Sequence, residues 1–323
     1  MMMKAAVYEQ YGPPEVVKVK QIPVPNPKKN KLLIKVIAST VNRTDCGFRS
    51  AQYFISRFFS GLFKPKFPVL GCEFAGIVEE TGSEVTKFKK GDRVFGFNDE
   101  TFGGHAEYLV IGENKALTTI PAGLSFEDAA PITEGSHYAL ESIRAAKVKP
   151  SDNVMVYGAT GAIGSAAVQL LKHFATHVTA VCNTKNVELI RSLGPDVVID
   201  YQTEDFTKTD RKFSFILDAV GKSSFKECKP LLTEKGIYIS TELGKNGENI
   251  WYALTTPLSG GKKVVFSMPG INRYDVEFLK SLVEAGEFRP ITEKYYKLDD
   301  IVDAYKYVET GQKTGNVIIK IVN

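Results

Sequence analysis

Short runs of alternating hydrophobic and polar positions fill the first 124 residues of the chain. The runs are rich in β-branched or aromatic residues and are separated by Gly and Pro, a pattern typical of strands joined by turns. The predicted strands are residues 5–9, 16–21, 31–41, 76–80, 93–97, 106–111 and 117–120. Many short strands with this punctuation predict a small β-barrel or a distorted sandwich.

The period of the pattern changes near Ser125, which precedes two acidic residues and is expected to cap a helix. Helical periodicity continues to about Lys147, with interruptions near Pro131 and Gly135. Apolar runs then alternate with helical segments. The predicted strands are 153–157, 177–182, 196–200, 213–219, 236–241 and 262–267, and the predicted helices are 162–174, 185–193, 223–232 and 274–285. This alternation predicts an α/β fold with a doubly wound parallel sheet.

The end of the chain departs from the alternation. A helix is predicted to begin at Asp299, and the last apolar run predicts a strand over 316–321. This strand fits the β-rich domain better than the parallel sheet, so we expect the β-rich domain to be discontinuous. The predicted domains are 1–124 with 291–323, and 125–290.

One turn of the second domain carries a glycine at every third position, between a predicted strand and a predicted helix. Read from Ala159, it is the dinucleotide fingerprint G-x-G-x-x-G with the first glycine replaced by alanine. Gly161 would allow a pyrophosphate to approach the backbone, and Gly164 would let the helix pack close to the strand. The helix N-terminus offers N–H groups to the phosphates. The residues expected to bind a dinucleotide here are Gly158, Thr160, Gly161, Ala162, Ile163 and Gly164.

The identity of the dinucleotide is predicted from the end of the second strand of this domain. NAD-binding folds place an acid there, but residues 181–186 contain none. Lys185, together with the polar groups of Asn183 and Thr184, would attract the extra phosphate of NADPH. The alternative is that Lys185 is simply a solvated residue in the first turn of a helix. We therefore predict NADPH. Tyr201 is expected to line the adenosine pocket or to pack, and Val220 is assigned to the same site.

Composition narrows the function classes further. The 323 residues are 43% hydrophobic and carry a net charge of +4, too mild a balance to predict a nucleic-acid partner. The four cysteines and four histidines show no zinc-knuckle spacing, which is typical of free thiols in a reducing compartment. No apolar run reaches the ~20 residues that span a bilayer. We expect a soluble cytoplasmic protein without a membrane partner.

Several runs resemble the medium-chain dehydrogenase/reductase superfamily, and within it the zinc-independent quinone oxidoreductase (zeta-crystallin-like) branch. They are the glycine turn and residues 70–76, 91–96, 103–108, 183–186 and 310–317, so the resemblance covers essentially the whole chain. It implies a GroES-like catalytic domain and a Rossmann domain, with nicotinamide in the cleft between them. It also implies a homodimer formed through edge strands of the Rossmann sheets, supplied by 236–241 or 262–267.

The resemblance also locates the positions at which zinc-dependent members hold their metal. Here these positions are Asn42, Cys72 and Glu134. Asn is a poor zinc ligand, and the two remaining groups fall short of the three ligands of a catalytic site, although each of them is able to coordinate. We therefore predict that no metal is bound.

Without a Lewis acid, hydrogen bonds must polarise the electron acceptor, which suits quinones and α,β-unsaturated carbonyls. Asn42 is expected to hold the nicotinamide or the substrate oxygen. Tyr53 is the predicted phenolic donor, with a packed aromatic as the alternative. Asp45 is a site residue or a structural ion-pair partner of Arg49. His137 is a weaker candidate, because a buried histidine in a helix is commoner.

Two other interpretations of the chain stay open. One is a zinc-containing alcohol dehydrogenase or ketone reductase, and the other is a non-enzymatic NADPH-binding protein. The Phe-rich stretch 53–67 is expected to cap an apolar substrate pocket. An oligomer contact or a membrane-surface patch is its alternative role.

Overall fold

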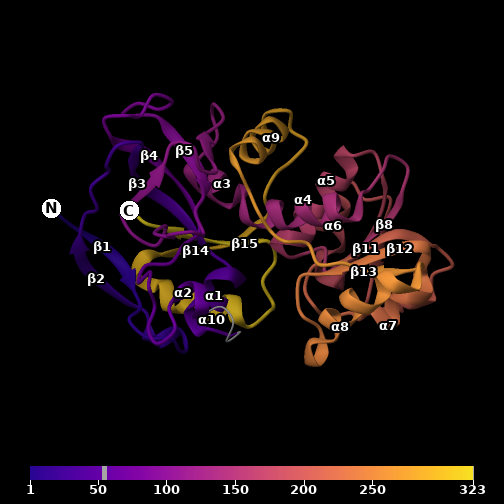
Figure 1. Cartoon of the computed structure of the whole chain (residues 1–323). Coiled ribbons are helices and arrows are strands. Elements are labelled where there is room, and N and C mark those ends of the chain that lie inside the picture. Colours follow the sequence, from indigo (N-terminus) through magenta and orange to yellow (C-terminus); the bar gives the residue numbers. More distant parts are fainter. Residues whose placement is uncertain (53–56, 323) are drawn as a thin grey trace. The chain divides into compact units, whose positions relative to one another are not determined.

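The computed structural model describes residues 1–52 and 57–322. The chain forms two compact units, each described separately below, and its elements are labelled in Figure 1. The first unit comprises Met1–Glu134, Ile271–Ala285 and Pro290–Asn323. The second comprises Gly135–Gly270 and Gly286–Arg289. The chain therefore leaves the first unit and returns to it twice.

The second unit contains a six-stranded parallel sheet with the order β10-β9-β8-β11-β12-β13. Its strands are β8 (Asn153–Tyr157), β9 (His177–Cys182), β10 (Val197–Asp200), β11 (Phe213–Asp218), β12 (Leu232–Ser240) and β13 (Lys263–Val264). In the order of the chain this is 3-2-1-4-5-6, the arrangement of a Rossmann fold. The predicted fold class is confirmed. Of the two segments expected at a sheet edge, 236–241 is wrong, because β12 is paired on both sides, and β13, within 262–267, forms that edge.

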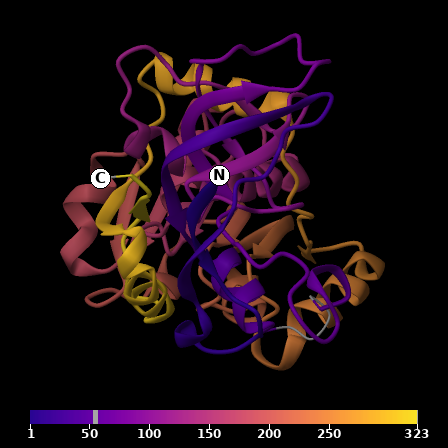
Figure 2. The same ribbon diagram turned by 90° about the vertical axis from the view of Figure 1, so that its left-hand side faces the viewer.

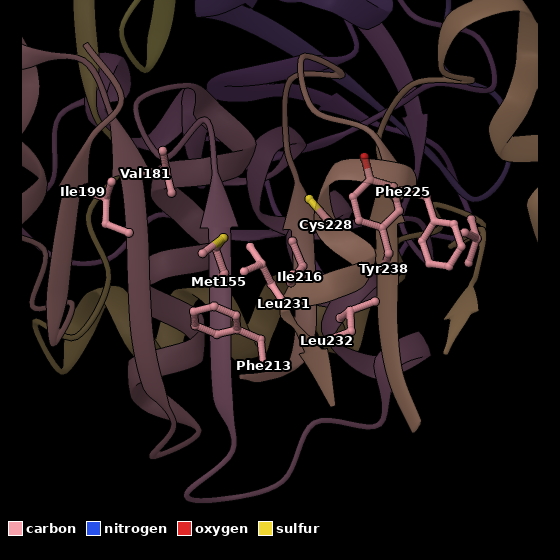
Figure 3. Packing of buried hydrophobic residues seen from close by; sticks show 11 residues of the cluster. Met155, Val181, Ile199, Phe213, Ile216, Phe225, Cys228, Leu231, Leu232 and Tyr238 are labelled. Carbon is pink, nitrogen blue, oxygen red and sulfur yellow. The ribbon is translucent and has the colours of Figure 1, made fainter. Parts of the chain in front are cut away.

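The sheet is buried because its strands carry near-continuous apolar runs, as parallel strands covered on both faces require. Figure 3 shows the apolar cluster between the sheet and α7. The helices of this unit are α4 (Glu134–Ala146, whose first residue belongs to the first unit), α5 (Ala162–His173), α6 (Val187–Arg191), α7 (Phe225–Cys228) and α8 (Glu248–Thr255). The helix predicted over 223–232 is much shorter. The α-helix ends at Cys228, a 3-10 turn that contains Pro230 follows over Lys229–Leu231, and β12 begins at Leu232.

The first unit is built on a sheet with the order β14-β15-β3-β4-β5-β7, with β6 also paired to β3. Its strands are β3 (Lys31–Val41), β4 (Glu73–Thr81), β5 (Arg93–Phe97), β6 (Tyr108–Gly112), β7 (Leu117–Thr119), β14 (Thr292–Lys297) and β15 (Asn316–Lys320), and β1 (Met2–Val7) pairs with β2 (Lys18–Pro23). The last strand, β15, lies between β14 and β3. This is the neighbourhood expected for 316–321. Figure 2 shows this β-rich unit turned toward the viewer.

The helices of the first unit come from widely separated parts of the chain. They are α1 (Arg43–Ser50), α2 (Arg57–Ser60), α3 (Phe126–Ala129), α9 (Arg273–Glu284) and α10 (Ile301–Glu309). The alternation in the sequence assigned 274–285 to the parallel sheet, but α9 packs against β7 instead. The ammonium of Lys280 donates to the hydroxyl of Thr119 at 2.8 Å, and the guanidinium of Arg273 lies over the ring of Phe88.

No helix within residues 1–52 and 57–322 combines the length and the apolar character that crossing a membrane requires.

Candidate functional site

The turn between β8 and α5 is shaped by two glycines that cannot be replaced without a clash. Gly158 has a φ of 79°, and a Cβ there would lie 2.5 Å from Val220 Cγ2. A Cβ at Gly164 would lie 2.1 Å from the carbonyl oxygen of Gly158. The packing function expected for Gly164 follows from this distance, because α5 begins in direct contact with the turn.

Gly161 differs from Gly158 and Gly164, because the nearest atoms outside its chain neighbours would lie 3.9 Å from a Cβ at this position. It is the N-cap of α5, and no side chain caps the helix here within the described chain. The first N–H groups of α5, on Ala162 and Ile163, therefore lie at the positive end of the helix without a side-chain cap from Gly161. This environment fits the diphosphate of a dinucleotide.

A buried carboxylate fixes the loop on the other side of this turn. Asp218, at the end of β11, accepts hydrogen bonds from the N–H groups of Val220 (3.1 Å), Gly221 (2.8 Å) and Ser223 (3.0 Å). It also accepts a hydrogen bond from the phenol of Tyr238 at 3.2 Å. Burial raises the pKa of Asp218, and the hydrogen bonds oppose this shift. Asp218 was not among the residues predicted from the sequence, although an acid at the end of a strand, three residues before Gly221, was a visible signal.

The residues predicted for the adenosine end lie in two neighbouring loops. Asn183 precedes a 3-10 turn, Thr184–Asn186, which carries the exposed Lys185. The hydroxyl of Thr184 donates to Asp200 at 2.6 Å and so joins this turn to the end of β10. Tyr201 follows Asp200, and its ring centroid lies 6.4 Å from that of Tyr157, the residue before the glycine turn. The second unit therefore brings the predicted cofactor-binding residues to one end of its sheet.

In the first unit, Asn42 ends β3 and caps α1. Its Oδ1 accepts from the N–H of Asp45 at 2.9 Å, and its Nδ2 donates to the sulfur of Cys72 at 3.0 Å. The side chain is only 2% exposed. Both ends of the amide are thus engaged within the protein, and its predicted contact with the nicotinamide or the substrate stays a prediction.

Asp45 lies beneath Asn42 and is completely buried. It accepts hydrogen bonds from the N–H groups of Gly71 (3.0 Å) and Asn42 (3.2 Å), while burial raises its pKa to about 7. The alternative prediction, an ion pair between Asp45 and Arg49, is wrong. Arg49 belongs to the last turn of α1, where its guanidinium reaches Glu309 of α10.

Two buried glutamates form a second acidic group in this unit. Glu73 accepts from the N–H groups of Thr133 (2.9 Å) and Glu134 (2.5 Å) and from the hydroxyl of Thr40 (2.7 Å). Glu134 accepts from the hydroxyl of Thr44 at 3.0 Å. Burial and then the charge of Glu134 raise the pKa of Glu73 to about 8, and burial raises the pKa of Glu134 to about 7. Burial thus favours the protonated form of both carboxyls, while the hydrogen bonds from Thr40, Thr133 and Glu134 to Glu73 oppose the shift.

The other predicted candidates are Tyr53, His137 and a possible metal site. Tyr53 lies outside the described residues. His137 is buried in α4 with its ring 4.5 Å from that of Tyr138, as expected for a packed histidine. Among the residues that the structure describes, no group of three His, Cys, Asp or Glu side chains is arranged to hold a metal ion.

Part of the Phe-rich stretch is described, and it exposes apolar side chains. Tyr11 anchors it through hydrogen bonds to the hydroxyl of Ser60 (2.8 Å) and the carbonyl of Gly61 (2.6 Å). Phe58 is 68% exposed and Phe63 89% exposed. That the stretch 53–67 caps a substrate pocket stays a prediction.

The chain matches two family models and is similar to known oxidoreductases. Residues 28–122 match "Alcohol dehydrogenase GroES-like domain", and residues 193–319 match "Zinc-binding dehydrogenase". A 2-methylene-furan-3-one reductase of Solanum lycopersicum is 32% identical over 98% of this chain and 79% of its own. A chloroplastic NADPH-dependent alkenal/one oxidoreductase of Arabidopsis thaliana is 30% identical over the same shares. The structure of a quinone oxidoreductase from Coxiella burnetii superimposes with a TM-score of 0.89, at 27% identity and with both chains fully covered.

The chain therefore belongs to the medium-chain dehydrogenase/reductase superfamily, as its sequence motifs predicted. Within it, the chain is an oxidoreductase of the branch that contains the quinone oxidoreductases and alkenal reductases, and it uses a nicotinamide cofactor.

Proposed function

We propose that this protein reduces quinones or α,β-unsaturated carbonyls with NADPH and without a metal. The open, uncapped N-terminus of α5 at Gly161 is the observation that carries the proposal. The names of its relatives, which describe reductases of quinones, enones and alkenals, support the substrate class. The three positions at which zinc-dependent members bind their metal support the metal-free reaction, since one of them is Asn42.

The second unit would bind the cofactor. The N–H groups of Ala162 and Ile163 would receive the diphosphate, whereas the N–H of Gly161 donates to the carbonyl of Gly158 at 3.3 Å. Val220 is held beside the turn by Asp218. Tyr201 is proposed for the adenosine. When bound, the nicotinamide would supply hydride to the acceptor.

Selection of NADPH is proposed to depend on Lys185. It is exposed in the turn after β9, where an NAD-binding fold would place an acid. Substitution of Lys185 by Ala is expected to raise the KM for NADPH by about tenfold and to leave the KM for NADH nearly unchanged, because the lost contact to phosphate is worth about 1–3 kcal/mol. An unchanged ratio of the two constants would contradict this assignment.

In the first unit, hydrogen bonds would polarise the acceptor carbonyl in place of a metal. We propose Asn42 and Tyr53 as donors to the substrate oxygen. Asp45 would act on Asn42, because its carboxylate accepts the N–H of Asn42 and its N–H donates to the Asn42 side chain. Orientation of the acceptor would contribute most of the remaining acceleration.

A pair of glycine variants tests the cofactor site. Gly161→Ala adds a methyl group to open space, so we expect normal folding and a Kd for NADPH at least about tenfold higher, as expected when a methyl group obstructs a backbone–phosphate contact. Gly164→Ala pushes α5 away from the turn and is expected to lower the melting temperature. NADPH titration calorimetry and an NADPH-oxidation screen over quinones, enones and aldehydes measure the outcome. Unimpaired NADPH binding by Gly161→Ala would refute the proposed site.

We also propose a cytoplasmic homodimer formed through the β13 edge. The adjoining segment exposes Trp251 (67%), Leu254 (68%) and Leu258 (88%), which supports a contact with a second copy. Light scattering coupled to size exclusion measures the mass. Trp251→Glu with Leu254→Glu should yield monomers, whereas Phe63→Glu, a similarly exposed position in the first unit, should not.

A further inference from the structure

Three side chains at the adenosine end of the second unit form a closed hydrogen-bond network. Asp200 Oδ2 accepts from the Thr184 hydroxyl at 2.6 Å, and Asp200 Oδ1 accepts from the N–H of Gln202 at 3.0 Å. Gln202 Oε1 in turn accepts from the N–H of Thr184 at 3.0 Å. Each of the three residues therefore contacts the other two, and Thr184 lies 16 positions from Asp200 and 18 from Gln202 in sequence.

Along the chain, the residues of this network alternate with the residues proposed to bind the cofactor. Thr184 lies between Asn183 and Lys185, and Tyr201 lies between Asp200 and Gln202. Asp200 is only 9% exposed, whereas Tyr201 is 48% exposed. The network thus holds the backbone of both loops, while the neighbouring side chains remain accessible.

The turn that carries Lys185 depends on such support. It is a 3-10 turn of three residues, Thr184–Asn186, that leads directly into α6. Its N-cap residue Asn183 caps no backbone N–H, although its side chain accepts from the amide of Asn186 at 2.7 Å. Short helical segments have little stability of their own. The two hydrogen bonds made by Thr184, one from its N–H and one from its hydroxyl, fix the start of this turn. Fixing a loop before binding reduces the entropy lost when a ligand is bound.

We propose that Thr184, Asp200 and Gln202 are positioning residues for the 2′-phosphate of NADPH. The network holds the turn so that Lys185 meets the phosphate without further ordering of the backbone. This proposal rests on the preference for NADPH proposed above. It also accounts for a carboxylate near a phosphate site, since both oxygens of Asp200 are occupied by donors of the protein.

The test removes one hydroxyl and follows two cofactors. Thr184→Val keeps the shape of the side chain but loses the bond to Asp200. We expect its Kd for NADPH to rise about tenfold and its Kd for NADH to change less than about twofold, because NADH lacks the 2′-phosphate. Thr184→Ser restores the hydroxyl and should return the Kd for NADPH to within about twofold of the parent value.

The matched control is Thr207→Val. Thr207 donates to Asp205 at 2.6 Å, the same length as the Thr184–Asp200 bond, but in an exposed loop outside the network. Its variant should bind both cofactors like the parent protein. Equal weakening of NADPH and NADH in Thr184→Val, or no change in either, would overturn the proposal. A parent protein that binds NADH as tightly as NADPH would instead overturn the proposed cofactor preference.

Discussion

The side-chain amide of Asn42 donates a hydrogen bond to the sulfur of Cys72 at 3.0 Å, and both residues occupy positions that the resemblance to zinc-dependent members assigns to metal ligands. Burial, followed by the charge of Asp45, raises the pKa of the Cys72 thiol well above its usual range. A protonated thiol is a poor zinc ligand, because the thiolate is the coordinating form. Two of the three positions that the resemblance assigns to metal ligands are thus held by an amide and a neutral thiol in contact with each other.

Zinc content should accordingly depend on residue 42. We expect the parent protein, purified without chelators, to contain less than about 0.1 zinc per chain, and Asn42→Cys to approach about one, because a second thiolate completes a three-ligand set with Cys72 and Glu134. Mass spectrometry of the metal measures this. Asn42→Ser removes the amide without adding a strong ligand and should remain near the parent content. Stoichiometric zinc in the parent protein would refute the metal-free reaction.

Stability should decrease with rising pH through the Glu73–Glu134 pair. Their folded-state pKa values, about 8 and about 7, lie above the ordinary value of 4.5. The folded state therefore keeps protons that the unfolded chain releases, so the stabilisation is complete below pH ~4.5 and is lost as the pH rises toward 8.

Glu73→Gln is expected to flatten this dependence and to be more stable than the parent protein at pH 8 by about 1–3 kcal/mol. Urea unfolding at pH 5, 6.5 and 8 measures the free energies. Glu79→Gln, at an exposed salt bridge with Lys90, should change them by less than about 0.5 kcal/mol. A steeper loss at high pH in Glu73→Gln would contradict the raised pKa.

Arg49 should be among the residues most important for the stability of the first unit. Its guanidinium is 1% exposed, pairs with Glu309, donates to the carbonyl of Gly12 and lies 5.2 Å from the ring centroid of Tyr305. Arg49→Ala leaves these partners without a donor and is expected to lower the free energy of unfolding by about 3–5 kcal/mol.

The control for Arg49 is Lys115→Ala, which breaks an exposed ion pair with Glu100 and should have an effect below about 1 kcal/mol. Chemical denaturation followed by circular dichroism compares the two variants. Similar effects of both would show that burial does not strengthen the Arg49–Glu309 contact.

Cofactor binding should also depend on Tyr238, which does not belong to the glycine turn. Tyr238→Phe removes a hydrogen bond to Asp218, the carboxylate that organises residues 220–223. We expect the Kd for NADPH to rise about threefold, and about tenfold in Asp218→Asn, which turns one accepting oxygen into a donor. Tyr305→Phe also removes the hydroxyl of a fully buried tyrosine, but in the first unit, and should leave this Kd unchanged.

The parts of the fold and site that could be predicted are those encoded locally. Alternating periods revealed both sheets, and the spacing of Gly158, Gly161 and Gly164 identified the phosphate-binding turn. Local signals failed where a residue acts through distant partners. The residues next to Glu73 in the sequence give no sign that its carboxyl accepts hydrogen bonds from the backbone of residues 133 and 134. Likewise, the partner of Arg49 lies 260 positions away. For the same reason the link between Thr184 and Asp200 emerged only from the structure.

The position of β15 has a consequence for how the molecule is made. Residues 316–320 are synthesised after the other strands of this sheet, yet β15 lies inside it, between β14 and β3. The second unit has all its residues by Arg289, whereas residues 38–41 of β3 gain their β15 partners only when residues 317–320 arrive. Residues 31–35 of β3 pair with β6. Because domains tend to fold as they emerge during synthesis, we expect the second unit to complete its fold while the sheet of the first unit still lacks β15.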